Sequence, residues 1–156
     1  MDPAQTLDVI FILDQANAMT IATVGEEGFN RLTAAFYDGV AADPLLRPLY
    51  PEGELEPARR RLALFLMQYF GGPTAYSDER GHPRLRMRHF AFPIDQARRD
   101  AWLRHMAAAL DSLELTPEVR ATMQRYFEDA ATFLVNRAEG DPERLPLRGV
   151  STPPGG

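Results

Sequence analysis

The stretch RGHPRLRMRH, residues 80–89, holds four arginines and two of the three histidines of the chain. The chain as a whole is acidic, with a formal net charge of −5 at pH 7, so this stretch is opposite in charge to the molecule. Its imidazoles are candidate metal ligands or proton carriers, and its guanidinium groups attract anions. We therefore expect the stretch to hold an anionic partner beside a metal or a proton-transfer centre.

Length and composition bound the class of protein. With 156 residues, 45% hydrophobic and 25% charged, the chain is typical of one globular domain with a sizeable core. Its net negative charge argues against a general binder of nucleic acid or anionic membranes, because both need a broad positive field. The absence of cysteine excludes disulfides and thiolate metal sites, so any metal must use His, carboxylate or Tyr ligands.

The N-terminal region contains a short apolar run, VIFIL at residues 9–13. This run is too short to span a bilayer, and it lacks the basic segment that opens a signal peptide. We therefore expect a cytoplasmic protein without a membrane partner.

Hydrophobic periodicity predicts an all-α fold with four substantial helices, since no segment alternates with the period of a strand. The first helix begins at Glu26, and the second carries an apolar stripe from Leu55 to Tyr69. Asp95 caps the third helix, and Thr116 followed by proline begins the fourth. We expect two antiparallel pairs packed across each other, with a gap where an irregular stretch connects the second and third helices.

That irregular stretch covers residues 73–93, whose three prolines and one glycine rule out a long helix. Around the helices we expect three parts: an N-terminal extension at residues 1–23, a folded domain at residues 24–137, and a disordered tail containing proline and glycine at residues 138–156. A short turn capped by Asp43 separates the first two helices.

His89 lies between the arginines and an apolar segment that includes Phe92. A haem site needs this combination: an imidazole for the iron, apolar side chains for the porphyrin faces, and cations for the propionates. Other interpretations are open at this point. A lone histidine is more often solvated or satisfied in a core, and arginines often form a solvated face.

Six motifs occur in an order and spacing that resemble the group II truncated haemoglobins. They are FY at residues 36–37, DPLL at 43–46, LYP at 49–51, QYFGGP at 68–73, RGHPRLRMRH at 80–89 and RDAWL at 99–103. The resemblance covers residues 24–137. It implies a truncated globin fold, a two-over-two helical sandwich around haem, which agrees with the helix count inferred from periodicity.

The resemblance implies a role for each residue at a matching position. His89 matches the proximal iron ligand of the family, whereas His82 matches a position that does not bind iron. The distal ligand-binding side would consist of Tyr37, Tyr50, Trp102, Ala58 and Leu62. The cofactor-binding residues would be Arg61, Tyr76 and Arg88 at the haem propionates, and Phe65, Leu66, Leu85 and Phe92 at the haem faces. Each member of the last group fits an ordinary core position equally well.

The family implies haem b, iron protoporphyrin IX, as the cofactor, and reversible binding of O2 and other diatomic ligands as the function. The same site would support nitric oxide detoxification or a peroxidase-like reaction, with electrons from a reductase. Both a monomer and a homodimer are compatible with the sequence. The alternative is a haem-free helical interaction module that docks an acidic partner through residues 80–89.

Two positions depart from the family pattern. A single glycine, Gly25, precedes the first long helix where the family usually has a pair, and this bears on the angle at which that helix begins. Phe70 stands where many relatives have tryptophan.

Overall fold

The computed structural model describes residues 3–89 and 92–137, with side chains from residue 17 onward except that of Arg86. Every regular element in these ranges is a helix, as the periodicity predicts. The elements in chain order are α1 (Pro3–Ala41), η1 (Arg47–Leu49), α2 (Leu55–Tyr69), α3 (Ala75–Arg80), α4 (Leu85–His89), α5 (Gln96–Asp111) and α6 (Pro117–Phe133). The tail expected at residues 138–156 lies outside the described residues.

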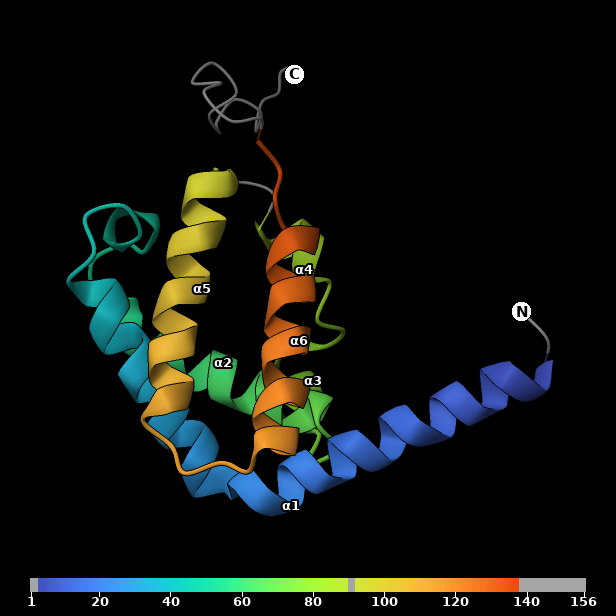
Figure 1. Ribbon diagram of the computed structural model, residues 1–156. Helices are drawn as coiled ribbons and strands as arrows, with labels where there is room; N and C mark the ends of the chain where they lie inside the picture. The colour runs from blue at the N-terminus through green and yellow to red at the C-terminus, as the bar shows by residue number, and fades with distance from the viewer. Residues whose placement is uncertain (1–2, 90–91, 138–156) are drawn as a thin grey trace.

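The four long helices form two pairs that pack across each other, as the sequence predicts. The first pair is α1 with α2, and the second is α5 with α6, whose helices run side by side and are joined by a short turn (Figure 1). α1 also contacts both α5 and α6, so it connects the two pairs. The side chains between the pairs are fully buried, among them Phe29, Leu32, Phe36, Leu66, Phe70, Met106, Leu110 and Met123.

The helix starts predicted at Asp95 and Thr116 are confirmed, and so is the interruption of helical structure predicted within residues 73–93. The carboxylate of Asp95 accepts a hydrogen bond from the Arg98 backbone N–H at 2.9 Å, and the Thr116 hydroxyl accepts one from Val119 at 3.3 Å. Within residues 73–93, the helical elements of the described residues are short, six residues in α3 and five in α4. The described part of residues 73–93 therefore contains no long helix, and α4 ends at His89.

The periodicity placed the start of the first clear helix at Glu26, and the second of the two helical segments of α1 begins there, just after Gly25. A first segment, from Pro3, precedes it, and this N-terminal half of α1 projects away from the other helices (Figure 1). Gly25 interrupts α1 with φ 67° and ψ 176°, a conformation available essentially only to glycine. One glycine therefore suffices to redirect the chain before the segment that enters the core.

The last turns before Gly25 also pack against the domain. Thr20 is fully buried, and Ile21 packs against the core, close to the backbone of Gly72. Part of the segment assigned to the N-terminal extension thus contributes to the folded unit, while the boundary at residue 24 stays a prediction.

Phe70, at the position where many relatives carry tryptophan, is fully buried at the end of α2. Its ring stacks on that of Phe29 with centroids 6.0 Å apart and an interplanar angle of 20°. The smaller ring therefore still joins α2 to α1 in the core.

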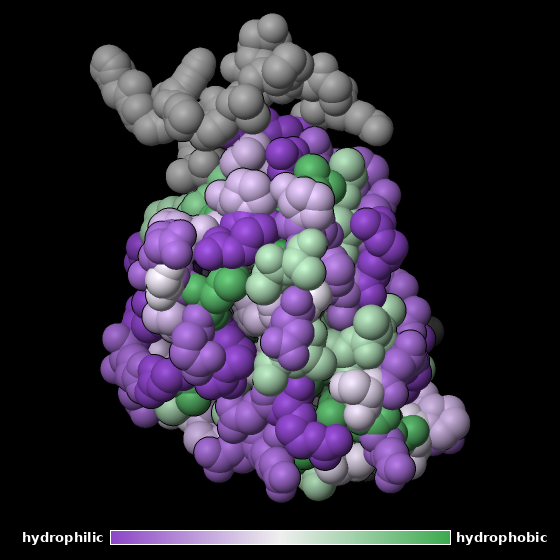
Figure 2. Space-filling model, turned by 90° about the vertical axis from the view of Figure 1, so that its left-hand side faces the viewer, coloured by the Kyte–Doolittle hydropathy of each residue, from purple (hydrophilic) through white to green (hydrophobic). Residues whose placement is uncertain are grey.

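The face of the molecule in Figure 2 is mainly hydrophilic, with hydrophobic residues in small separate patches. None of the helices that the structure describes is long and apolar enough to cross a membrane.

Candidate functional site

The three aromatic residues predicted for the distal side come together from different segments. Tyr37 lies on α1, Tyr50 directly follows η1, and Trp102 lies on α5. The Tyr37 and Tyr50 rings meet edge to face with centroids 5.5 Å apart. Phe36 contacts both Tyr37 and Trp102, at centroid distances of 4.9 Å and 5.0 Å. We call Tyr37, Tyr50 and Trp102 the distal cage.

The two phenols of the cage are held in their neutral form. Burial raises the pKa of Tyr37 well above its usual value, and interactions with Tyr50, including a hydrogen bond, add to this rise. Burial also raises the pKa of Tyr50, although its hydrogen bond with Tyr37 and the positive charge of Arg61 lower it in part. Each neutral phenol keeps its O–H proton and can therefore act as a hydrogen-bond donor.

α2 carries two apolar strips that differ in burial. Ala63, Leu66 and Met67 face the core and are buried, so the structure places Leu66 among ordinary core residues and its haem contact stays a prediction. Two other residues of α2 that were predicted to line the site, Leu62 and Phe65, are only partly buried. Folding of the chain alone therefore leaves apolar surface on this side of α2.

Ala58 and Arg61 belong to the first half of α2. Ala58 is buried and has no polar group, so it cannot donate a hydrogen bond to a distal ligand. The guanidinium group of Arg61 lies 3.9 Å from the Glu54 carboxylate, and its charge acts on both phenols of the cage. Arg61 is thus close to the distal cage as well as to solvent.

Tyr76 is held at the base of α3 by the aromatic side chains of α2. It is 5% exposed, and its ring meets that of Phe65 edge to face at 5.4 Å. The neighbouring Ser77 bonds twice to the Gln68 amide, which accepts from the Ser77 backbone N–H at 2.9 Å and donates to its hydroxyl at 2.7 Å. The sequence motif containing Gln68 thus fixes the position of Tyr76, a role that we did not predict.

The imidazole of His89 is fixed at one nitrogen. Its Nδ1 lies 2.8 Å from the backbone carbonyl oxygen of Leu85, one turn earlier in α4. A carbonyl oxygen only accepts, so Nδ1 carries the proton and Nε2 has a free lone pair. Metal-bound histidines in proteins commonly have this second bond, which fixes both tautomer and ring orientation.

His82, the other histidine of residues 80–89, has a different environment from His89. It is exposed, and its Nδ1 accepts a hydrogen bond from the Arg84 backbone N–H at 3.1 Å. Gly81 and Arg84 on either side both have positive φ, at 79° and 45°. His82 therefore shapes the turn between α3 and α4.

Arg88, predicted to bind a haem propionate, uses two of its donors within the loop. Its Nε donates to the Pro83 carbonyl at 2.7 Å, and its Nη2 donates to the Arg80 carbonyl at 2.8 Å. These bonds hold the loop against α4, and a contact with a propionate stays a prediction.

Large apolar side chains also remain exposed around His89. Met87 is 61% exposed and Phe92 is 38% exposed, and the Phe92 ring lies 6.5 Å from that of His89. Leu85, whose carbonyl holds the imidazole, is partly buried. The side chains of Met87 and Phe92 leave apolar surface beside the imidazole.

These residues fit the haem that the resemblance implies. In the described residues, no group of three or more His, Asp or Glu side chains could hold a metal ion. His89 offers one ligand atom, which suits a metal that brings its remaining ligands with it, as haem iron does. Apolar side chains on α2 and beside α4, neutral phenols on the distal side and the cation of Arg61 supply the other groups that haem requires.

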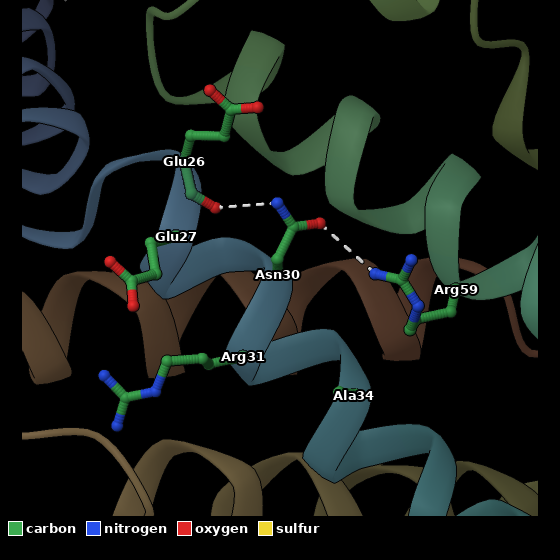
Figure 3. A pocket seen from close by; sticks show the side chains of 6 residues that line it. All are labelled: Glu26, Glu27, Asn30, Arg31, Ala34 and Arg59. Atoms are coloured by element: carbon green, nitrogen blue, oxygen red, sulfur yellow. Dashed lines mark hydrogen bonds between the residues drawn. The ribbon is translucent and has the colours of Figure 1, made fainter.

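Two hollows on the surface differ in whether predicted site residues line them. The larger, about 770 Å³, lies over the start of the second half of α1 and over Arg59 of α2. In Figure 3, Asn30 bridges its walls by donating to the Glu26 carbonyl at 3.1 Å and accepting from Arg59 at 3.2 Å. This hollow contains none of the predicted site residues. The smaller, about 420 Å³, includes Arg61 together with the ion pair of Arg60 and Glu79.

Asp43 and His105 form a pair that we did not predict. It connects the helix that carries Trp102 to the turn before Tyr50. His105 Nε2 donates to the Asp43 carboxylate at 2.7 Å, which joins α5 to the turn that leads to Tyr50. The pair fits closely, because a Cβ added at Gly39 would lie 2.4 Å from His105 Nδ1. The position of His105 three residues after Trp102 was the only sequence signal, and it indicated no partner.

Comparison with known proteins places these features in a family. A family model described as bacterial-like globin matches residues 22–136. The chain is 43% identical over 118 residues to the group 2 truncated hemoglobin YjbI of Bacillus subtilis, an alignment that covers 76% of this chain and 89% of the relative.

Solved structures agree with the sequence comparison. A thermostable hemoglobin from Thermobifida fusca is similar with a TM-score of 0.73 and 55% identity, over 75% of this chain and 96% of that one. A truncated oxygen-avid haemoglobin from Bacillus subtilis is similar with a TM-score of 0.71 and 42% identity, over 75% of this chain and 98% of that one.

The Asp43–His105 pair predicts a specific pH dependence of stability. The hydrogen bond from His105, followed by that from the Leu45 backbone, lowers the pKa of Asp43 in the folded protein. The pair therefore stabilises the fold above the unfolded-state pKa of about 4, and this contribution is lost as pH falls through the lower folded pKa. In denaturant unfolding, Asp43→Asn should destabilise most near neutral pH and progressively less in acid.

The exposed Asp38 on α1 provides the matched control, because Asp38→Asn makes the same chemical change outside the pair. A destabilisation by Asp43→Asn that is equal at all pH values would contradict an ionic contribution from this carboxylate.

Proposed function

This chain belongs to the group II truncated haemoglobins, and on that premise we propose that it binds haem b through His89 and reversibly binds O2 and other diatomic ligands. The observation that carries the proposal is the hydrogen bond between His89 Nδ1 and the Leu85 carbonyl, which leaves Nε2 as a free ligand atom. The name of a relative, a truncated oxygen-avid haemoglobin, supports O2 as one ligand.

On the proximal side, His89 Nε2 is the atom that would hold the iron. When bound, haem supplies an iron centre with an open coordination position for a diatomic ligand. The bond to Leu85 keeps the proton on Nδ1 and restricts rotation of the ring, so that Nε2 faces one direction. The exposed apolar surface of Met87 and Phe92 beside it is available for contact with a porphyrin.

On the distal side, the cage offers neutral donors. The neutral O–H groups of Tyr37 and Tyr50 can donate to a ligand, and so can the indole N–H of Trp102. A hydrogen bond to a ligand that carries negative charge is worth about 1.5–3 kcal/mol, against about 0.5–1.5 kcal/mol for a neutral one.

The edges and faces of the haem would meet the remaining predicted residues. Arg61 and Arg88 carry the positive charge that propionates need, and Tyr76 supplies a hydroxyl. Leu62, Phe65, Leu85 and Phe92 supply apolar contact, and Leu66 supports them from the core.

Nitric oxide detoxification and a peroxidase-like reaction extend the same proposal. Both use the ligand site and donors described above, and both need electrons that a separate reductase must provide. The absence of a membrane-spanning segment among the described helices is compatible with the cytoplasmic location that we propose.

Removal of the two histidines tests the assignment of the iron ligand. His89→Gly should abolish stable haem ligation because it removes Nε2, and free imidazole added to the variant should restore it in part. His82→Gly makes the same change in the same loop and should leave the haem absorption spectrum as in the wild type. Retention of normal ligation in His89→Gly, or its loss only in His82→Gly, would show that the assignment is wrong.

Removal of single distal donors tests the cage. Tyr37→Phe, Tyr50→Phe and Trp102→Phe should each speed O2 dissociation, by about tenfold or more where the lost bond was to a charged acceptor. The effects of the two tyrosines should not add, since each hydroxyl orients the other. Stopped-flow measurement of O2 release and of autoxidation provides the rates.

Tyr126→Phe is the matched control for these variants. Tyr126 is also a tyrosine whose burial raises its pKa, but it stacks on Tyr69 at 4.0 Å, outside the cage. If none of the three cage variants differs from this control in either rate, the distal cage as described does not contact the ligand.

A further inference from the structure

Asn136 lies just beyond the end of α6, two residues after the C-cap Leu134. Its side chain is half-buried. It reaches the backbone that follows α4, more than forty positions earlier in the chain, at His89, Phe92 and Ile94. The iron ligand of the proposed function is one of the three residues that it contacts.

All four hydrogen-bonding positions of the Asn136 amide are occupied. Nδ2 donates to the carbonyl of His89 at 3.2 Å and to the carbonyl of Phe92 at 3.0 Å. Oδ1 accepts from the Ile94 backbone N–H at 2.9 Å and from Arg137 Nη1 at 3.2 Å. The Asn136 backbone N–H also donates to the Ile94 carbonyl at 2.8 Å.

These partners determine which way the amide faces. The carbonyls of His89 and Phe92 can only accept, and the N–H of Ile94 can only donate. No other polar side chain of similar size supplies two donors and two acceptors in this arrangement. Aspartate has the same shape but would direct a carboxylate oxygen at two carbonyl oxygens.

The contact matters because α4 is a five-residue helix that ends at His89. So short a helix has little stability of its own, and its last carbonyls have no partner within the helix. The His89 carbonyl instead accepts from Asn136 Nδ2 and from the Phe92 N–H at 3.0 Å. The backbone of His89 is therefore tied to the end of α6, while its ring is tied to Leu85.

We propose that Asn136 is a positioning residue for the proximal histidine, and that it sets where the imidazole stands relative to the haem by tying the end of α4 to α6. This role rests on the proposed function of His89. It gives α6, which carries none of the predicted site residues, a direct part in the strength of iron ligation.

The test compares Asn136→Ala and Asn136→Asp with the wild type as haem-loaded full-length proteins. Asn136→Ala removes all four bonds, and Asn136→Asp keeps the acceptor while removing both donors to the carbonyls. Two quantities are measured: the rate of haem transfer to excess apomyoglobin, and the iron–histidine stretching band of the ferrous protein by resonance Raman spectroscopy. Loss of a residue that supports a metal ligand typically weakens metal binding by about 10- to 100-fold. We expect a comparable acceleration of haem loss and a shifted or broadened band in both variants.

Thr116→Ala is the control for general destabilisation, because it removes the cap at the opposite end of the same helix. It should lower the melting temperature, because it removes a helix cap, and leave the iron–histidine band unchanged. A wild-type band in both Asn136 variants, or an equal shift in Thr116→Ala, would overturn the positioning role. If Asn136→Ala does not fold, Asn136→Asp decides by the same criterion.

Failure of the proposed function would look different. In that case the wild type itself would show no iron–histidine band, whereas failure of the positioning role leaves the wild-type band intact and the variants identical to it.

Discussion

The hydrogen bond from His89 Nδ1 to the Leu85 carbonyl is the interaction on which the proposed site depends. It settles which imidazole nitrogen is free, and it does so within a single turn of a very short helix. Such a helix does not hold its own position, so the surrounding chain must supply the constraint. Arg88 closes the loop before it, and Asn136 secures the backbone after it.

Each side of the expected haem position is therefore organised by a contact between distant segments. On the distal side, His105 of α5 holds Asp43 and so fixes the turn that leads to Tyr50. On the proximal side, Asn136 joins the end of α6 to the end of α4. The second helix pair thus supports both faces of the site, although it contributes only Trp102 to the predicted ligand contacts. This arrangement allows the site residues themselves to keep their donors and apolar surface for the cofactor and its ligand.

Much of this fold was predictable because its signals are local. Apolar spacing placed α2, α5 and α6, and Asp95 and Thr116 marked two helix starts that the structure confirms. The same spacing placed the start of the second helical segment of α1 just after Gly25, where the backbone is non-helical, but it gave no clear sign of the helical segment before that glycine. Asn136 and the partner of His105 were missed because their bonds join residues far apart in sequence, which leaves no periodic signal. The roles of the predicted site residues came from motif resemblance, and the structure adds tautomer, protonation state and hydrogen-bond partners to them.

The long-range contacts have value for function only if the space between the two sides is filled by haem. The most direct measurement is the visible absorption spectrum of the purified full-length protein after reconstitution with haem, in its ferric, ferrous and CO-bound forms. Ligation by one histidine predicts a strong Soret band that shifts on reduction and again on CO binding. A spectrum that matches free haem, with no Soret shift on addition of the protein, would contradict the haem site and favour a haem-free helical interaction module.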